Sequence, residues 1–349
     1  MATTFKNFTP DDIATTAKIF HEAIPVTGSI VSGTYLSGTT ETNIKNYAHG
    51  MFQSVYDYPY LSSSANRIFD LSVGYANSST LSSSANQQNS KKINMYNLMA
   101  QSLVGFDLTG SIRLFDQDCD FAAGGNKFKE IFIIPFTRLL VKDEIKKGSF
   151  QLSVYRSGSN ASRSKLETLS DYGAATNYFV NQAGGECAMI FSSSANTGST
   201  DGLGLIYYQQ GVVILTASVF QQAFGMASVT SSWTGSVSTA FQSASIQQLA
   251  DGFRHRVNSI LFNNVTEINS TIYFCRKNAN EFNYSSNPSY LSGSKIIVKG
   301  NNPQNQPISY ATKVGLYNAQ GELLAVCGAS ENFKFTPDVN VTIRCRLDY

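Results

Sequence analysis

The stretch EIFIIPF, residues Glu130–Phe136, decides the fold class of this chain. Every residue from Ile131 to Ile134 is large and apolar, so an extended segment here would bury both of its faces. The run is also too short for a typical buried helix. Pro135 cannot donate a backbone hydrogen bond, which predicts an edge or a bulge near the end. The stretch therefore predicts a buried strand in a β-rich domain.

Further strand patterns lie on both sides of this run. Phe69, Leu71, Val73 and Tyr75 alternate with polar or small residues, which is typical of a strand. The other predicted strands of the middle region are Ser111–Phe115, Ser149–Tyr155, Cys187–Phe191, Leu203–Tyr208 and Gly211–Leu215.

The C-terminal region reads as a separate antiparallel unit. Asn318–Gly321 predicts a hairpin loop that ends in glycine. The final residues alternate up to the C-terminus, so we expect the chain end to be held in a strand. The predicted strands are Asn269–Arg276, Ser294–Val298, Thr312–Tyr317, Glu322–Cys327 and Val341–Leu347.

Helix signals are fewer. Thr9 and Pro10, followed by acids, predict an N-terminal helix that continues to Ala23. Other predicted helices are Asn43–Tyr56, Ile93–Val104 with Lys91 and Lys92 in solvent, Leu140–Lys147, and a helical region between about 216 and 260.

The predicted fold is mainly β (α+β), with antiparallel β-sandwich-like domains, a few helices, and an N-terminal helix plus extended arm. We expect the helix and arm in residues 1–60, a central β-rich domain in 61–255 and the C-terminal antiparallel unit in 256–349. Apolar residues between Ser29 and Thr42 are too sparse to form a core. The arm, taken as residues 1–47, is therefore predicted to be an assembly element that reaches onto another chain. The alternative is that it packs back on its own central domain.

Composition limits the possible functions. Charged residues make up 14% of the chain and the net charge is +2, which argues against electrostatic binding of nucleic acid. The polar, weakly charged surface suits a protein buried by neighbours, or a secreted or glycan-decorated β protein. No apolar run approaches the length of about 20 residues that spans a membrane. The five cysteines show no C-x-x-C spacing and are predicted to be reduced, mostly core residues. With no secretory signal pattern, we expect synthesis in a reducing cytoplasm.

Chemical motifs are sparse. Asp116, Asp118 and Asp120 follow the start of a D-x-D-x-D calcium loop, but Phe121 replaces the glycine and Lys127 replaces the last acid. An acidic, salt-bridging loop is therefore preferred over a calcium site.

His21, His49 and His255 are isolated in sequence, and Trp233 fits a satellite core or a docking anchor. We predict no enzyme activity, no catalytic residues, no cofactor and no metal.

Several stretches together resemble virion structural proteins of tailed bacteriophages, in particular large contractile-tailed phages of cyanobacteria and marine bacteria. The resemblance covers about residues 55 to 349 and includes YDYPYLSSSANRIFDLSVGY, KKINMYNLMAQSLVG and RLLVKDEIKKGSFQLSV. The family signature E-F-N-Y-S-x-N-P, its G-L-Y-N hairpin and its terminal R-x-R-L-D match Glu281–Pro288, Gly315–Asn318 and Arg344–Asp348.

The resemblance implies a non-enzymatic structural subunit in the tail or baseplate of a virion assembled in the host cytoplasm. Its expected partners are other virion proteins, such as tail tube, sheath or baseplate neighbours, and copies of itself. The alternatives are a receptor- or glycan-binding tail protein, or a neck- or capsid-associated structural protein.

Overall fold

The structure is a computed structural model. It describes residues 5–83, 87–120, 124–158, 163–220, 226–227, 232–233, 236–279, 281–282, 288–293, 295–296 and 306–349. The chain is mainly β, with 46% strand, 18% helix and several antiparallel sheets, which confirms the predicted fold class. Contacts divide it into unit 1, Met1–Ile19 with Glu267–Tyr349, and unit 2, Phe20–Thr266. The domain bounds expected from the sequence remain a prediction: 1–60, 61–255 and 256–349.

Unit 2 is built on an eight-stranded antiparallel sheet, with the predicted buried strand in its middle. In spatial order the strands are β13 (Phe179–Asn181), β14 (Gly185–Ile190), β15 (Gly204–Tyr207), β16 (Val212–Thr216), β9 (Glu130–Pro135), β6 (Arg67–Tyr75), β5 (Gln53–Tyr56) and β4 (Ile44–Asn46). Pro135 is the last residue of β9, where the loss of one donor is tolerated.

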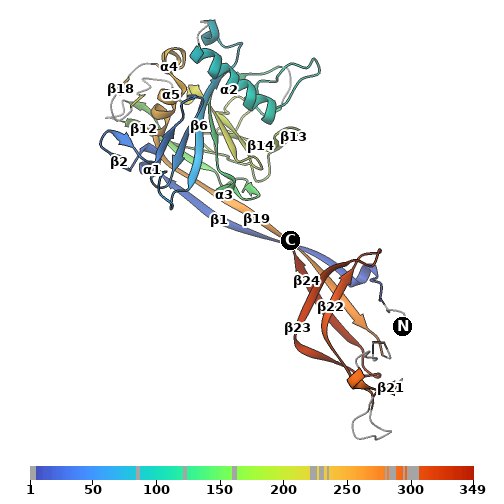
Figure 1. Ribbon diagram of the computed structural model, residues 1–349. Coiled ribbons are helices and arrows are strands. Elements are labelled where there is room, and N and C mark those ends of the chain that lie inside the picture. The colour runs from blue at the N-terminus through green and yellow to red at the C-terminus, as the bar shows by residue number, and fades with distance from the viewer. Residues whose placement is uncertain are drawn as a thin grey trace. The chain divides into compact units, whose positions relative to one another are not determined.

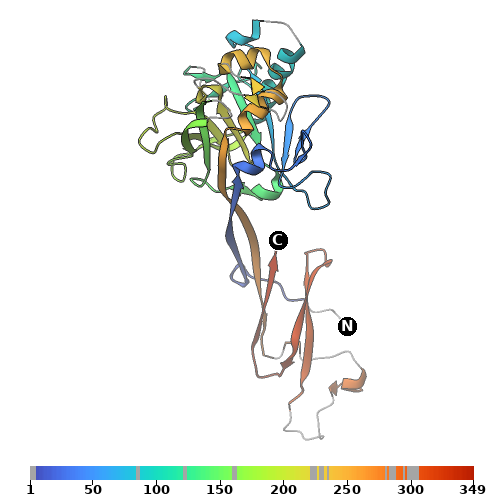
Figure 2. The same cartoon turned by 90° about the vertical axis from the view of Figure 1, so that its left-hand side faces the viewer.

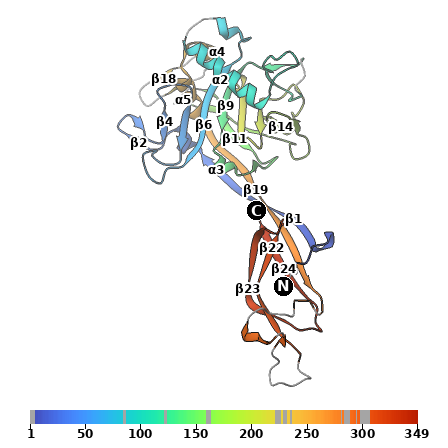
Figure 3. The same cartoon turned by 45° about the vertical axis from the view of Figure 1, so that its right-hand side comes forward.

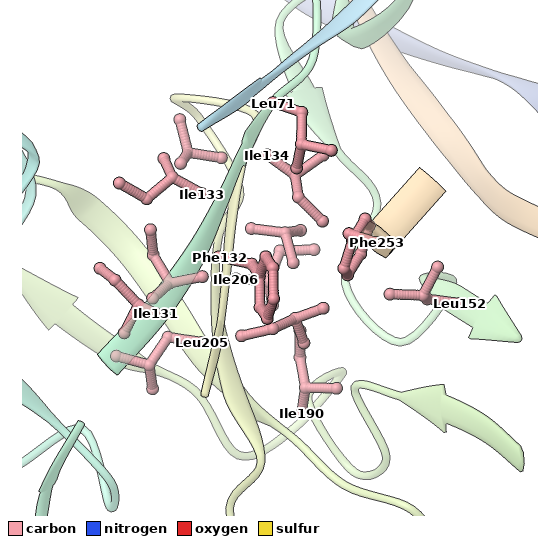
Figure 4. Packing of buried hydrophobic residues seen from close by; sticks show 14 of the residues in the cluster. Leu71, Ile131, Phe132, Ile133, Ile134, Leu152, Ile190, Leu205, Ile206 and Phe253 are labelled. Atoms are coloured by element: carbon pink, nitrogen blue, oxygen red, sulfur yellow. The ribbon is translucent and has the colours of Figure 1, made fainter. Parts of the chain in front are cut away.

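Both faces of this sheet are covered. Ile131 and Ile133 point to one side of β9, and Phe132 and Ile134 point to the other (Figure 4). On the first side lies α2 (Gln87–Leu103), which confirms the predicted third helix (Figure 1). The helix lies so close to β6 that a Cβ on Gly74 would be 2.8 Å from the backbone nitrogen of Tyr96. The absence of a side chain at this position therefore permits the packing.

A second antiparallel sheet covers the Phe132 side. Its strands are β1 (Ile13–Thr27), β19 (Val257–Lys277), β11 (Gln151–Gly158) and β12 (Arg163–Ser170), with β10 (Glu144–Ile145) and β24 (Val341–Asp348) also paired to β19. The ring of Phe136 packs 4.9 Å from that of Phe262 in β19. The ring of Phe132 lies 5.0 Å from that of Phe253 in α5 (Ile246–Arg254).

Unit 1 contains the end of β19 with β24, and the long hairpin of β22 (Ser309–Tyr317) and β23 (Leu323–Phe335) (Figure 3). The predicted Asn318–Gly321 loop connects these two strands, with Gly321 at a φ of 82°. Backbone bonds between Asn269 and Tyr349 hold the C-terminal residue, so the prediction of a fixed chain end is confirmed.

The remaining elements are short. The helices are α1 (Gly28–Ser32), α3 (Arg138–Val141), α4 (Val237–Ser243) and the 3-10 turns Pro10–Asp12, Thr80–Ser83, Ala217–Val219 and Pro288–Tyr290. The strands are β2 (Leu36–Ser37), β3 (Thr40–Glu41), β7 (Phe115–Asp116), β8 (Lys127–Phe128), β17 (Met226–Ala227), β18 (Ser232–Trp233), β20 (Leu291–Ser292) and β21 (Lys295–Ile296).

The predicted N-terminal helix is wrong. Thr9 and Asp12 do form the capping interaction, with the Thr9 backbone N–H donating to Asp12 Oδ2 at 3.0 Å, but it closes only a single 3-10 turn. The chain then continues as β1, which pairs with β19 (Figure 2). Its many Ile, Val and Thr residues favour a strand. β1 is the edge strand of its sheet, where Pro25 is tolerated.

The predicted helix over Asn43–Tyr56 is also wrong, since this segment forms β4 and β5. A turn from Tyr47 to Gly50, which has a φ of 64°, separates the two strands. Only Arg138–Val141 of the region around the predicted Leu140–Lys147 helix is helical. In the predicted helical region 216–260, α4 and α5 are the α-helices among the described residues.

Candidate functional site

A concave feature lies within unit 1. It is a cavity of about 830 Å³ between the N-terminal segment, the end of β19 and the β22–β23 hairpin. Asn7, Asn318 and Gln320 are among its lining residues. The aromatic residues that line it are Phe5, Phe8, Phe274, Phe282, Tyr317 and Phe335.

The N-terminal segment forms one wall because four contacts hold it on unit 1. The ring of Phe5 lies 5.1 Å from that of Tyr317, edge to face, and the ring of Phe8 lies 5.3 Å from that of Tyr273. Two ion pairs accompany these contacts: Lys6 with Glu281 at 2.7 Å, and Arg276 with Asp12 at 2.5 Å.

These contacts correct the picture of a free arm. Residues 5–12 contact the C-terminal strands of their own chain, whereas the alternative to the assembly-arm hypothesis placed the arm on the central domain. Residues 13–19 also belong to unit 1, as the start of β1, and residues 20–47 belong to unit 2, where Val31 is fully buried.

Glu281, Asp12 and Cys275, in or beside the cavity lining, are already paired. The hydrogen bond from Lys6 lowers the pKa of Glu281, and hydrogen bonds from Thr9 lower the pKa of Asp12. Burial raises the pKa of the Cys275 thiol, which donates to Cys345 at 3.8 Å. A thiol with a raised pKa is a poor nucleophile. The site is therefore suited to binding an apolar or aromatic group rather than to covalent chemistry.

The hairpin beside the cavity has an apolar outer surface. Leu324 is 69% exposed, and Val326, two residues further on the same face of β23, is 51% exposed. Tyr317 and Leu323 are register partners and are both about half exposed. We call these four residues, Tyr317, Leu323, Leu324 and Val326, the hairpin patch.

The acidic loop predicted from the sequence lies in unit 2, between β7 and β8. The structure brings Asp116, Asp118 and Asp120 together, with one ligand oxygen of each within 4.8 Å of the others. Lys127 forms an ion pair with Asp116, as expected for a salt-bridging loop. Burial raises the pKa of Asp116 to about 6 despite this pair. Phe121, the departure from the calcium pattern, lies outside the described residues.

The cysteines agree with the predicted reduced, largely core set. All five are free, and Cys119, Cys187 and Cys345 are buried. The thiols of Cys119 and Cys187 share a hydrogen bond at 2.7 Å. That bond and burial raise the pKa of Cys119, so its thiol remains protonated at neutral pH.

The three histidines lie in different surroundings. His21 Nδ1 is 3.3 Å from the carbonyl oxygen of Asn264, and His49 Nδ1 accepts from the backbone N–H of Met51 at 3.0 Å. His255 Nε2 lies 3.7 Å from Glu41. Trp233 belongs to β18, but its side chain lies outside what the structure describes.

Sequence reasoning missed the buried ionic groups of unit 2. Arg254 is fully buried and donates to Glu41 at 2.7 Å, to Asp251 at 2.6 Å and to Gln53 at 2.6 Å. Lys92, predicted to be in solvent, is buried and donates to the Phe241 carbonyl at 2.6 Å. Desolvation lowers the pKa of this lysine to about 8. Helical spacing offered no signal for these groups, because most of their partners are far away in sequence.

Comparisons with family models and with curated protein sequences find no match. Among the described helices, none combines the length and apolar character needed to cross a membrane.

Proposed function

We propose that this protein is a non-enzymatic structural subunit of a bacteriophage virion, that it belongs to the tail or baseplate, and that it assembles through the hairpin patch of unit 1. One observation carries the proposal: the chain leaves these large apolar side chains of β22 and β23 exposed. An exposed apolar patch on a soluble protein commonly marks an interaction surface. Burying it against neighbouring subunits would remove apolar area from water.

Composition and the motif resemblance support the same class. Only 14% of the residues are charged, so few ions would lose hydration when neighbours cover the surface. The segments that resemble tail proteins include Gly315–Asn318, which contains the patch residue Tyr317. The expected partners are other virion proteins and further copies of this chain.

A second candidate function has its own observation. The cavity of unit 1 combines aromatic rings with the amides of Asn7, Asn318 and Gln320, a lining that suits sugar rings and their hydroxyl groups. This favours a receptor- or glycan-binding tail protein as the alternative. Neck or capsid attachment is the competing position for a structural subunit.

The decisive experiment measures incorporation into particles. The double variant Leu324→Gln, Val326→Gln should fold with the wild-type circular dichroism spectrum but enter purified virions at least about tenfold less often. Leu61→Gln is the matched control, because Leu61 is 88% exposed in unit 2 and should leave incorporation unchanged. Normal incorporation of the double variant would remove the patch from the proposal. Absence of the wild-type protein from particles would overturn the virion role.

A reconstruction of the intact particle would separate the remaining positions. We expect density for this chain in the tail or baseplate, in contact with tube, sheath or baseplate neighbours. Specific binding on a glycan array, lost in Gln320→Ala, would instead favour the second candidate.

A further inference from the structure

The loop between β7 and β8 in unit 2 gathers three carboxylates at one point. Asp116 is the last residue of β7 and pairs with Lys127 at the start of β8. Asp118 and Asp120 follow at alternate positions in the loop. One oxygen from each of the three acids lies within 4.8 Å of the other two. Three carboxylates at this spacing repel one another unless positive charge lies between them.

Lys127 supplies positive charge to this cluster. It forms its ion pair with Oδ2 of Asp116. The other oxygen, Oδ1, is buried, accepts no hydrogen bond from the part of the chain that the structure describes, and belongs to a side chain with 1% exposure. A buried carboxylate oxygen without a donor is costly, which is the second and independent indication that a ligand belongs here.

Gly125 lies beside two of the carboxylates. A Cβ built on it would lie 3.6 Å from Oδ1 of Asp116 and 3.8 Å from Oδ2 of Asp118. Oδ1 of Asp116 and Oδ2 of Asp118 therefore lie on the same side of the loop, next to a residue without a side chain.

We propose that this loop binds a calcium ion through the carboxylates of Asp116, Asp118 and Asp120. All three donors are hard oxygens, which calcium prefers. Calcium accepts irregular coordination, whereas magnesium requires a near-ideal octahedron. A soft metal would prefer thiolate ligands, but the nearby thiols of Cys119 and Cys187 are buried and share a hydrogen bond with each other.

The ion would hold a defined piece of unit 2. Gln117, between the first two ligands, donates through Nε2 to the carbonyls of Thr200 at 2.7 Å and Gly202 at 3.0 Å. Fixing the acidic loop therefore also fixes the loop around residue 200. Phe121 replaces the glycine of the sharp turn and Lys127 replaces the bidentate acid of tight calcium loops, so we expect affinity in the range of about 0.1 to 1 mM.

The test is calcium titration of the full-length protein after treatment with a chelator and its removal. Isothermal calorimetry with calcium chloride should show one site, and saturating calcium should raise the melting temperature. Magnesium chloride should bind at least about tenfold more weakly. Asp118→Asn should lower calcium affinity at least about tenfold, and Asp120→Asn, at an exposed position, should weaken it in the same direction.

Glu22→Gln is the matched control, because it removes one exposed carboxylate of unit 2 that lies outside the loop. It should leave calcium affinity unchanged. The proposal is overturned if the wild type gives no heat and no thermal shift in 10 mM calcium, a concentration about tenfold above the weakest expected affinity. It is also overturned if both folded aspartate variants bind as the wild type does. If Glu22→Gln and Asp118→Asn lowered calcium affinity equally, calcium would be attracted by the overall negative charge and not bound at this site.

Discussion

Unit 2 and unit 1 are both made of antiparallel strands, but they bury apolar side chains very differently. In unit 2 one continuous cluster extends from Val26 to Phe262 and covers both faces of the eight-stranded sheet. In the described part of unit 1, the buried apolar residues are Ile272, Leu316, Phe335 and Cys345. Many of its other large apolar residues are exposed.

The difference teaches that regular strand pairing and a hydrophobic core are separate properties. The β22–β23 hairpin is long and well registered, yet an isolated hairpin is marginally stable in water because it buries little surface. Unit 2 has the core expected of an independently stable domain. Unit 1 exposes large apolar side chains and would gain stability if a neighbouring subunit covered them. The assembly proposal rests on this property.

The largest expected effect is on the free energy of unfolding, and it compares a core residue of unit 2 with a residue of the hairpin patch in unit 1. Phe132→Ala should lower the free energy of unfolding by about 3–5 kcal/mol, because the ring packs against Phe220, Phe241 and Phe253 at 5.0–5.6 Å. Leu324→Ala should change it by less than about 0.5 kcal/mol, as for other exposed positions. Guanidinium unfolding, with hydrogen exchange of peptides from each unit, measures both.

A cost for Leu324→Ala as large as that for Phe132→Ala would contradict the contrast between the units. It would mean that the free chain already covers the hairpin patch, for instance in a dimer. Sedimentation at several concentrations would reveal such a dimer.

The sequence predicted those parts of the fold that depend on local pattern. Ile131–Ile134, the alternation around Val73 and the loop ending at Gly321 each carry their signal within a few residues. The N-terminal helix failed because a genuine capping signal at Thr9 was followed by β-branched residues, and pairing with β19 determined the outcome. Local spacing cannot reveal a partner about 250 residues away.

The same limit applies to the candidate sites. Asp116, Asp118 and Asp120 lie close together in sequence, so their cluster could be predicted, but the unpartnered oxygen of Asp116 could not. The cavity of unit 1 brings Phe5 from one end of the chain to Tyr317 near the other. Arg254 and Glu41 are likewise separated by 213 positions.

A smaller effect is the change of folding stability with pH. The contribution of Asp171 in unit 2 and that of Asp348 in unit 1 should change with pH in opposite directions. In unit 2, burial raises the pKa of Asp171 from 3.8 to about 6, although Gly148, Phe150 and Tyr208 donate hydrogen bonds to it. Between about pH 4 and pH 6 the folded chain therefore holds a proton that the unfolded chain has lost. The contribution of Asp171 to stability falls as pH rises through this window, by about 3 kcal/mol, and is constant above it.

In unit 1 the sign is reversed. Hydrogen bonds from Ser270 and Arg346 lower the pKa of Asp348, so its contribution is present at neutral pH and is lost on acidification. Unfolding of Asp171→Asn and wild type should be compared between pH 4 and 7, with Glu22→Gln as control. The Asp171→Asn variant should lose the part of the decrease between pH 4 and 6 that Asp171 causes, while the part from Asp116, whose pKa burial also raises to about 6, should remain. An unchanged pH profile in this variant would show that Asp171 titrates alike in the folded and unfolded chain.

The smallest predicted effect is that of a substitution in unit 1 that changes backbone strain without changing side-chain packing. Gly321 closes the β22–β23 loop with a φ of 82°, and a Cβ there would meet no atom within 4 Å. Gly321→Ala should therefore lower the free energy of unfolding only by the strain of alanine in the left-handed conformation, about 1 kcal/mol. Gly321→Asn should cost less, because asparagine tolerates this region better. The loop itself should survive, since Asn318 Oδ1 accepts from the backbone N–H groups of Gln320 and Glu322. Hydrogen exchange of β22 and β23 amides measures the cost without interference from unit 2. If alanine cost well over 2 kcal/mol while asparagine cost nothing, a neighbour would already pack on this loop, and unit 1 would be less open than its exposed residues indicate.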